Sequence, residues 1–184
     1  MEVDEVDAEG RTVWCGLFDV DDRAAAHDEL FERYAVGGAD GMPPAGIEFT
    51  RAIVAHDLAR VRALLTDDFV FHDRRRTGIG RLEGADAYLP SLAAVFELSP
   101  DARLESICTV GVRPDARVGL NRRWGTNREG GAFEIMTAAM VCYRDGRVAG
   151  LEVWEPEDLD AAVARFEGLD RPEHAARGTP NGER

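Results

Sequence analysis

The sequence predicts an α+β fold, because the order of its periodic segments, the turn signals between them and its length agree. Apolar residues at helical spacing dominate residues 47–97, and four strand-like runs joined by short turns follow. Helices followed by an antiparallel meander are typical of the α+β class. With 184 residues, the chain can bury one sizeable core but not two ordinary ones.

The helical half is predicted to begin after a break at residues 41–44, where Gly, Met and two Pro residues follow one another. Helical spacing of apolar residues predicts a helix over residues 47–56, and Asp57 can cap a second short helix behind it. Residues 69–73 have strand composition, and the glycines after them indicate a turn. A third helix is predicted over residues 85–97, because its apolar residues are spaced to face a core and a Ser-Pro-Asp sequence stops it.

The second half is predicted to be a four-stranded meander that ends in a helix. Asp145 and Gly146 lie between two apolar runs, which is a strong signal of a β-hairpin. The last run passes through Pro156 into a helix over residues 159–169, whose first turn is acidic, as the helix dipole prefers. Residues 171–184 contain few apolar residues and are predicted to be a disordered tail. The four strand-like runs are residues 104–112, 118–126, 132–143 and 148–154.

The N-terminal arm contains an internal repeat. Residues 10–30 align without gaps with residues 146–166, and both segments have the pattern of a strand, an acidic turn and an Ala-rich helix. One interpretation is chance similarity between two common strand-helix units. The other is that residues 1–43 resemble the final strand and helix of a preceding copy of the domain that spans residues 44–170. In that case we expect the arm to pack as an extra strand and helix against this sheet or a partner's.

Charge and composition exclude several classes of protein. The chain has 35 acidic and 22 basic residues, a net charge of -13, which repels polyanions and makes nucleic acid an unsuitable partner. Every basic residue is Arg. The absence of Lys excludes Schiff-base and pyridoxal-phosphate chemistry, which need a lysine amine, and the phosphate-binding loop whose Lys reaches the phosphates.

The sequence also predicts the cellular compartment of the protein. No apolar run approaches the roughly 20 residues that a membrane helix needs, so we expect no membrane association. Residues 1–10 are acidic and lack the basic and apolar regions of a signal peptide, so we expect a cytoplasmic protein. Cys15, Cys108 and Cys142 agree with this, because an odd, scattered set is no disulfide framework.

No cofactor or metal is expected. The histidines show no zinc-binding spacing with one another or with the cysteines. No Gly-x-Ser-x-Gly sequence is present, and the Gly78-Ile79-Gly80 segment lacks the third glycine of a dinucleotide fingerprint. The four histidines are His27, His56, His72 and His174.

Several short motifs occur in an order that characterises a known family. They are Asp-Asp-Phe-Val-Phe-His-Asp at residues 67–73, Gly78-Ile79-Gly80, Arg-Glu-Gly-Gly-Ala-Phe-Glu at residues 128–134, and a run that begins Trp-Glu-Pro-Glu-Asp at Trp154. Over about residues 44–169, the chain resembles the SnoaL-like, or polyketide-cyclase-like, branch of the nuclear transport factor 2 superfamily.

This resemblance implies a cone-shaped fold, in which a curved antiparallel sheet wraps around the N-terminal helices and encloses a cavity. It also implies a homodimer, formed in many members through the outer face of the sheet. Similar folds serve as aldol cyclases, isomerases, epoxide hydrolases, dehydratases and non-catalytic binders, so the fold does not name a reaction.

Asp73 is the first candidate catalytic residue. Side chains alternate along a strand, so Phe69, Phe71 and Asp73 share one face and His72 lies on the other. If the aromatic row faces a cavity, we expect burial to raise the pKa of Asp73 and to suit it to acid/base work. The open alternative is a structural ion pair with Arg75 or Arg76. His72 cannot join Asp73 on one metal ion and is assigned a flanking role.

Two glutamates are further candidates. In the cyclases that the chain resembles, an acid/base carboxylate lies on a late strand, and Glu152 is the nearest match. Glu134, one strand earlier, is a second candidate by the same alternation. The alternative for both is a solvated sheet residue.

Arg122, Trp124 and Tyr88 are candidate substrate-binding residues. Arg122 shares an apolar row with Trp124, and an isolated buried charge is costly, so it needs a partner. That partner is either a carboxylate or enolate ligand or a structural carboxylate, Asp73 or Glu134. Tyr88 and Trp124 could line a cavity or belong to the core.

Two functional hypotheses follow. The first is a cofactor-independent enzyme, a cyclase, isomerase or hydrolase, that acts on a small-molecule or natural-product intermediate by carboxylate acid/base chemistry. The alternative is a non-catalytic module for small-ligand binding or dimerisation. A carboxylate with a raised pKa in a solvent-reachable pocket favours the first, whereas a filled or purely apolar interior favours the second.

Overall fold

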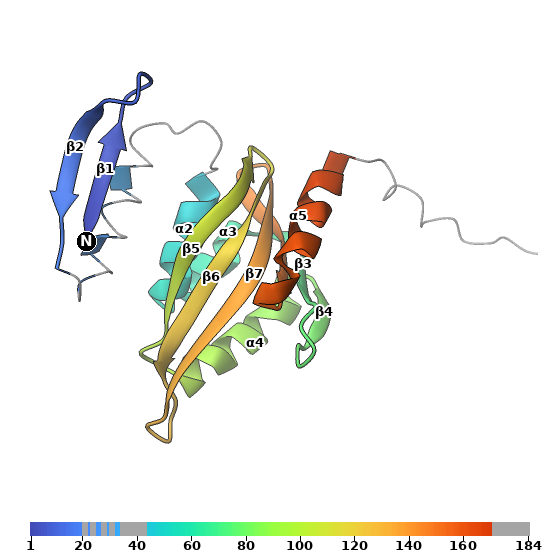
Figure 1. Ribbon diagram of the computed structural model, residues 1–184. Coiled ribbons are helices and arrows are strands. Elements are labelled where there is room, and N and C mark those ends of the chain that lie inside the picture. Colours follow the sequence, from blue (N-terminus) through green and yellow to red (C-terminus); the bar gives the residue numbers. More distant parts are fainter. Residues whose placement is uncertain (20–21, 23–24, 27–28, 30–31, 34–43, 171–184) are drawn as a thin grey trace, which may run out of the picture.

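The computed structural model describes residues 1–19, 22, 25–26, 29, 32–33 and 44–170, and Figure 1 shows their arrangement. Two helices begin the domain, α2 (Pro44–Val54) and α3 (Leu58–Leu64), and a third, α4 (Ala85–Leu98), follows the first two strands of the large sheet. Asp57 caps α3 as predicted, since its side chain accepts a hydrogen bond from the Arg60 backbone N–H at 2.9 Å. Within the described residues, none of the helices is long and apolar enough to cross a membrane.

A curved, unclosed six-stranded sheet packs with the helices and confirms the predicted α+β fold. The strand order is β4-β3-β8-β7-β6-β5. The four strands of the meander are adjacent, as predicted, and Asp145 and Gly146 both adopt positive φ angles in the last hairpin. The strands are β3 (Leu65–Asp73), β4 (Gly80–Glu83), β5 (Arg103–Arg113), β6 (Ala116–Thr126), β7 (Ala132–Arg144) and β8 (Arg147–Trp154).

Two features of the sheet differ from the sequence-based expectation. The predicted turn is present, since the Gly78 N–H donates to the Arg75 carbonyl at 3.0 Å, but the short edge strand β4 that begins at Gly80 and pairs with β3 was not predicted. In addition, β3 runs parallel to β8, so the sheet is not wholly antiparallel. A parallel neighbour must be reached by a crossover, and here α4 and the meander provide it.

Both faces of the sheet are covered. On the concave face, α2, α3 and α4 pack against a core that includes Phe69, Phe71 and Val141. On the outer face, α5 (Leu159–Glu167) packs through Phe166 against Met140 and its neighbours. Two short 3-10 helices, η1 (Pro156–Asp158) and η2 (Gly168–Asp170), flank α5. Adjacent residues of β7 therefore enter different cores.

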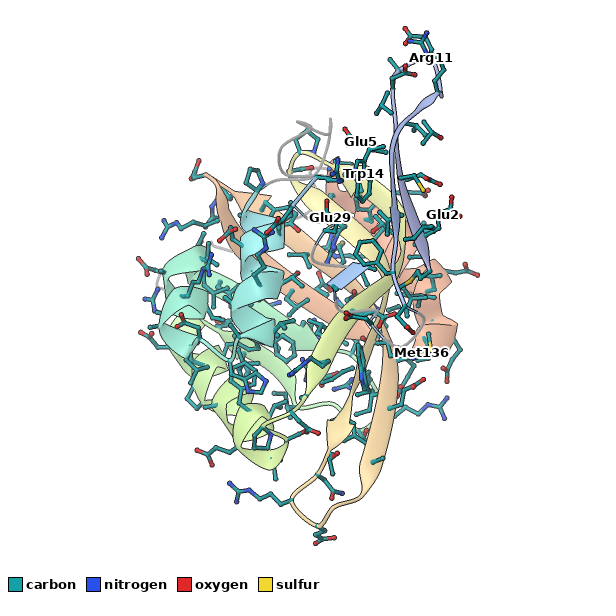
Figure 2. The ribbon with its side chains drawn as sticks, turned by 90° about the vertical axis from the view of Figure 1, so that its left-hand side faces the viewer. Glu2, Glu5, Arg11, Trp14, Glu29 and Met136 are labelled. Carbon is teal, nitrogen blue, oxygen red and sulfur yellow. The ribbon has the colours of Figure 1, made fainter. Side chains whose placement is uncertain are left out.

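The arm forms a separate two-stranded sheet, β1 (Glu2–Val6) and β2 (Thr12–Leu17), that stands apart from the large sheet (Figure 1). The Arg33 guanidinium lies 3.4 Å from the centre of the Trp14 ring and pairs with Glu5 at 3.0 Å. Figure 2 labels Trp14 and Glu5 on the hairpin. Glu32 pairs with Arg51 of α2 at 3.9 Å. Within the described residues, the arm does not add a strand to the six-stranded sheet.

The arm hairpin matches the last hairpin of the domain pair by pair. Four consecutive pairs, from Glu2↔Leu17 to Glu5↔Trp14, correspond in order to the pairs of β7 and β8 from Ala139↔Val153 to Cys142↔Gly150. Each hairpin then has a register irregularity at the same point, before Val6 and before Tyr143. This correspondence supports the repeat interpretation of the arm, which we retain as a proposal; residues 41–43 and the tail at 171–184 lie outside the described residues.

Removal of residues 1–43 should leave the domain folded, because neither apolar core of the domain contains a residue of the arm. We expect the midpoint of thermal unfolding to change by less than about 4 °C, which corresponds to roughly 1 kcal/mol for a domain of this size. Differential scanning calorimetry of both forms measures this. A shorter form that unfolds without a cooperative transition would show that the arm is part of the domain.

Candidate functional site

A cavity of about 490 Å³ lies between α4 and the concave face of the sheet. This volume is within the range of known small-molecule sites. Residues of α4 and of several strands of the sheet line this cavity. Its lining residues are Phe71, Asp73, Arg75, Ile79, Tyr88, Ser91, Leu92, Val95, Leu98, Ser99, Leu104, Arg123, Asn127, Phe133, Ile135, Thr137, Leu151 and Val153.

Some of the lining residues are unusually exposed apolar side chains. Ile79 and Leu98 are each 57% exposed and Ile135 is 44% exposed, although all three line the cavity. They come from the β3–β4 connection, the end of α4 and the middle of β7. Large apolar side chains that stay in water around a hollow are typical of a binding surface for an apolar ligand.

Asp73 projects into the cavity wall, as the alternation along β3 predicts, and is only 5% exposed. Its carboxylate oxygens accept hydrogen bonds from Arg75 Nε at 2.8 Å and Arg75 Nη2 at 2.7 Å. The backbone N–H groups of Arg75 and Ile79 also donate to it, each at 3.3 Å. Gly78 allows this wrapped loop, because a Cβ there would lie 2.5 Å from Asp73 Oδ1.

The expected rise in the pKa of Asp73 is not found. Burial alone would raise this pKa, but the hydrogen bonds and the charge of Arg75, together with the two backbone donors, outweigh burial and lower it. The carboxylate is therefore ionised at neutral pH. The structural alternative, an ion pair with Arg75, is the arrangement that the structure contains.

Tyr88 lines the cavity from α4, as one of the two predictions for it stated. Its ring packs between Phe69 and Phe71, with ring centres 5.1 Å and 4.9 Å away. Burial raises the pKa of its hydroxyl to about 12, so the group is a stable hydrogen-bond donor at neutral pH.

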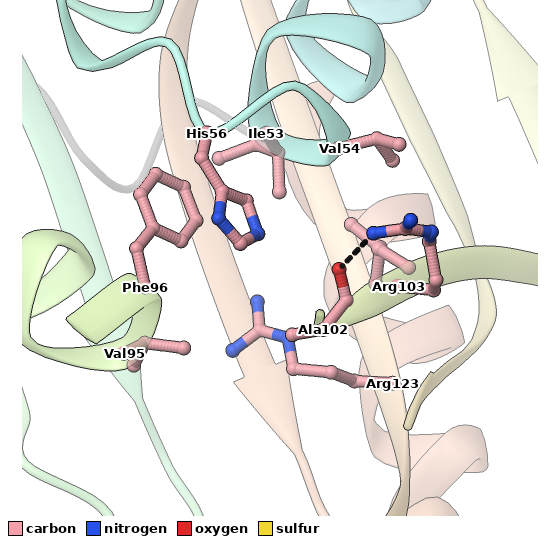
Figure 3. Close-up of a pocket in the computed structure, with 9 residues that line it drawn as sticks. Ile53, Val54, His56, Val95, Phe96, Ala102, Arg103 and Arg123 are labelled. Atoms are coloured by element: carbon pink, nitrogen blue, oxygen red, sulfur yellow. Dashed lines mark hydrogen bonds between the residues drawn. The ribbon is translucent and has the colours of Figure 1, made fainter. Parts of the chain in front are cut away.

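Arg123 is a charged lining residue of the cavity that the sequence analysis did not propose. It lines the cavity from β6 and also a small adjoining hollow of about 10 Å³, where its guanidinium lies below the His56 ring (Figure 3). Within the described part of the chain, this guanidinium makes no ion pair and no hydrogen bond. His56 stacks on Phe96 with ring centres 4.1 Å apart and forms the opposite wall of the hollow.

Arg122 and Trp124, predicted to position a ligand in the cavity, lie on the outer face of the sheet instead. The Arg122 guanidinium is 4.5 Å from the centre of the Trp124 ring and pairs with Glu105 at 3.0 Å and Glu134 at 3.4 Å. The predicted structural pairing with Glu134 is thus present, and Glu134 lies outside the cavity as well. The prediction placed Arg122 and Trp124 on the wrong face of the sheet. Because α5 packs on the outer face, that face is apolar as well, and hydrophobicity does not distinguish it from the concave face.

Glu152 and His72 also lie away from the cavity. They are neighbours in the register of β8 and β3, on the face opposite Asp73. Glu152 pairs with Arg74 at 2.7 Å and with Arg165 of α5 at 3.0 Å, which joins the helix to the sheet. Burial, followed by the charge of Arg74, lowers the pKa of His72. Neither side chain is placed to act on a ligand in the cavity.

The described residues offer the cavity no set of metal ligands, since Asp73 is its single carboxylate and no His or Cys lines it. A group of possible ligand atoms from Glu2, Asp4 and Cys15 lies on the exposed arm, far from this site in the sequence and in the fold. His27 and His174 lie outside the described residues.

The structure is an α+β fold with a curved sheet and a cavity on its concave face. Comparison of the sequence with family profiles names the family. Residues 47–151 match the SnoaL-like domain. The chain belongs to this family, which confirms the predicted resemblance. No curated protein gives a significant match to the sequence.

Solved structures of the same fold include enzymes and ligand complexes. An LEH-like epoxide hydrolase of Mycobacterium tuberculosis is 17% identical, with a TM-score of 0.52 over 69% of this chain and 92% of that protein. TerC, crystallised with polyporic acid, is 18% identical, with a TM-score of 0.52 over 67% and 93%. A second M. tuberculosis protein, in complex with estradiol-17beta-hemisuccinate, is 17% identical, with a TM-score of 0.54 over 61% and 92%. At such low sequence identities, the structural similarity shows a shared fold and no more.

Loss of the Asp73 carboxylate should destabilise the protein, because Arg75 would keep its charge without a partner. We expect Asp73→Asn to lower the free energy of unfolding at neutral pH by about 2–4 kcal/mol, less than for a fully buried pair because Arg75 is partly exposed. The matched control is Asp67→Asn on the same strand, whose exposed pair with Arg62 should contribute less than about 1 kcal/mol. Urea titrations measure both changes.

The same ion pair should make the free energy of unfolding depend on pH in the acidic range. The pKa of Asp73 lies below 3.8 in the folded state, so its contribution is complete above about pH 4 and is lost as the pH falls through the folded-state pKa. The difference in unfolding free energy between the wild type and Asp73→Asn should therefore shrink below pH 3.8. A difference that grows on acidification would contradict this assignment.

Proposed function

We propose that this chain binds a small, largely apolar organic molecule in the cavity between α4 and the six-stranded sheet. The observation that carries this proposal is the cavity itself: about 490 Å³ of space, bounded mostly by apolar side chains, with an exposed apolar rim and a few polar groups at defined positions. The ligand complexes of similar folds support the same use of the space.

The state of Asp73 favours binding over acid/base catalysis. Each carboxylate oxygen already accepts one hydrogen bond from the Arg75 side chain and one from a backbone N–H group. These four donors occupy the acceptor positions of a carboxylate. Because the lowered pKa also leaves Asp73 without a proton to donate, it is a poor general acid, and it can act as a base only after a donor is displaced.

A cyclase, isomerase or hydrolase with Asp73 as the base is the second candidate. The observation in its favour is that Asp73 is an ionised carboxylate in the wall of a cavity, where a ligand could compete for its oxygens. Native mass spectrometry of the purified protein identifies a co-purified ligand. Chemical conversion of that ligand by the wild type, and its loss in Asp73→Asn with the fold retained, would favour this candidate over simple binding.

Filling the cavity should abolish binding. Thr137 of β7 lines the cavity, so Thr137→Trp places an indole in the space for the ligand. We expect the affinity for the uncharged fluorescent probe N-phenylnaphthylamine to fall about tenfold or more, a loss of roughly 1.4 kcal/mol or greater.

Thr109→Trp provides the matched control, because Thr109 is an exposed residue of β5 that does not line the cavity. This variant should bind the probe as the wild type does. Equal binding by Thr137→Trp and the wild type would show that the probe lies elsewhere and would contradict the proposed function.

A further inference from the structure

We propose that the cavity takes an apolar ligand with a single negative charge, such as a carboxylate, a sulfonate or an enolate, and that Arg123 binds this charged group. The inference rests on the proposed function and adds the chemical class of the ligand and the residue that selects it. It depends on which charges in the cavity are already balanced and which one is not.

The ionised groups in the described lining of the cavity sum to one net positive charge. Asp73 and Arg75 neutralise each other through two hydrogen bonds of 2.8 Å and 2.7 Å. Arg123 is the other ionised group of the lining, and within the described residues no carboxylate pairs with it. A guanidinium stays protonated in proteins, so the cavity carries a net charge of about +1.

A shortage of acidic residues does not explain the free guanidinium. The chain has 35 acidic residues against 22 arginines, and the adjacent residue, Arg122, holds two carboxylates, Glu105 and Glu134, on the outer face. The two neighbouring arginines thus have opposite situations. On the outer face, glutamates of the chain balance the charge of Arg122. In the cavity, none of the described carboxylates balances the charge of Arg123.

The surroundings of Arg123 increase its attraction for an anion. Leu104 and Val95 line the hollow beside it, and burial lowers the pKa of the guanidinium, which reports the cost of holding this charge away from water. An anionic ligand removes part of that cost, and its attraction is stronger in such surroundings than in water. A guanidinium also offers paired N–H donors that match the two oxygens of a carboxylate.

Tyr88 supplies a second donor in the lining of the same cavity. The charge of the Arg123 guanidinium acts on the Tyr88 hydroxyl and opposes the rise in pKa that burial causes. Within the described residues, the hydroxyl has no hydrogen-bond partner. An oxyanion next to Arg123 could accept from both groups, which distinguishes this end of the cavity from the apolar rim at Ile79 and Leu98.

The test uses two probes with the same aromatic skeleton, anilinonaphthalenesulfonate, an anion, and N-phenylnaphthylamine, which is uncharged. Arg123→Gln should weaken binding of the anion about tenfold or more, the usual effect of losing a charge-assisted hydrogen bond. It should change binding of the uncharged probe less than about twofold. Arg147→Gln, at the exposed start of β8, is the matched control, because it changes the net charge equally outside the cavity.

The outcomes separate the two claims. Loss of anion binding in Arg123→Gln alone supports the inference. Equal binding of the anion by Arg123→Gln and Arg147→Gln, while Thr137→Trp abolishes binding of both probes, would overturn the inference but leave the proposed function intact. Binding of both probes that Thr137→Trp does not change would overturn the proposed function itself. A circular-dichroism melting curve for each variant verifies that the protein compared is folded.

Discussion

The structure depends on one constraint: the sheet of the domain must bury both of its faces. Three helices cover the concave face and α5 covers the outer face, so adjacent residues of a strand enter separate apolar cores. Curvature brings the concave face around the helices. The cavity is the space that remains between this face and α4, and residues of both line it.

Ion pairs at both faces hold this arrangement together. On the outer side, Glu152 links the sheet to α5 through Arg165, and Arg122 joins β5, β6 and β7 through two glutamates. On the inner side, Asp73 ties the β3–β4 loop to the end of its own strand. In each of these pairs, the arginine already has a carboxylate partner within the chain. Arg123 is charged and has no such partner among the described residues, so it is the group best suited to bind a ligand.

Much of the fold could be predicted from local patterns. The helices, the meander and the Asp145-Gly146 hairpin follow from periodicity and turn chemistry, and the motif order identified the family. The parallel pairing of β3 with β8 could not be predicted, because a contact between strands that are distant in the sequence leaves no local signal. The strand β4 is too short, at four residues, to show an alternation.

The candidate site was harder to predict for a physical reason. Alternation correctly grouped Asp73 with Phe71 and Arg122 with Trp124, but both faces of the sheet are apolar, so alternation could not show which group faces inward. Similarly, the sequence shows that Asp73 is near Arg75, yet the direction of its pKa depends on the geometry of four hydrogen bonds. The predicted homodimer stays a prediction.

The most direct test is a crystal structure of the protein with bound anilinonaphthalenesulfonate. We expect the aromatic rings to lie between α4 and β7 and the sulfonate oxygens to accept hydrogen bonds from the Arg123 guanidinium. Density for the probe on the outer face near Trp124, or a cavity closed by side chains, would contradict the proposed site.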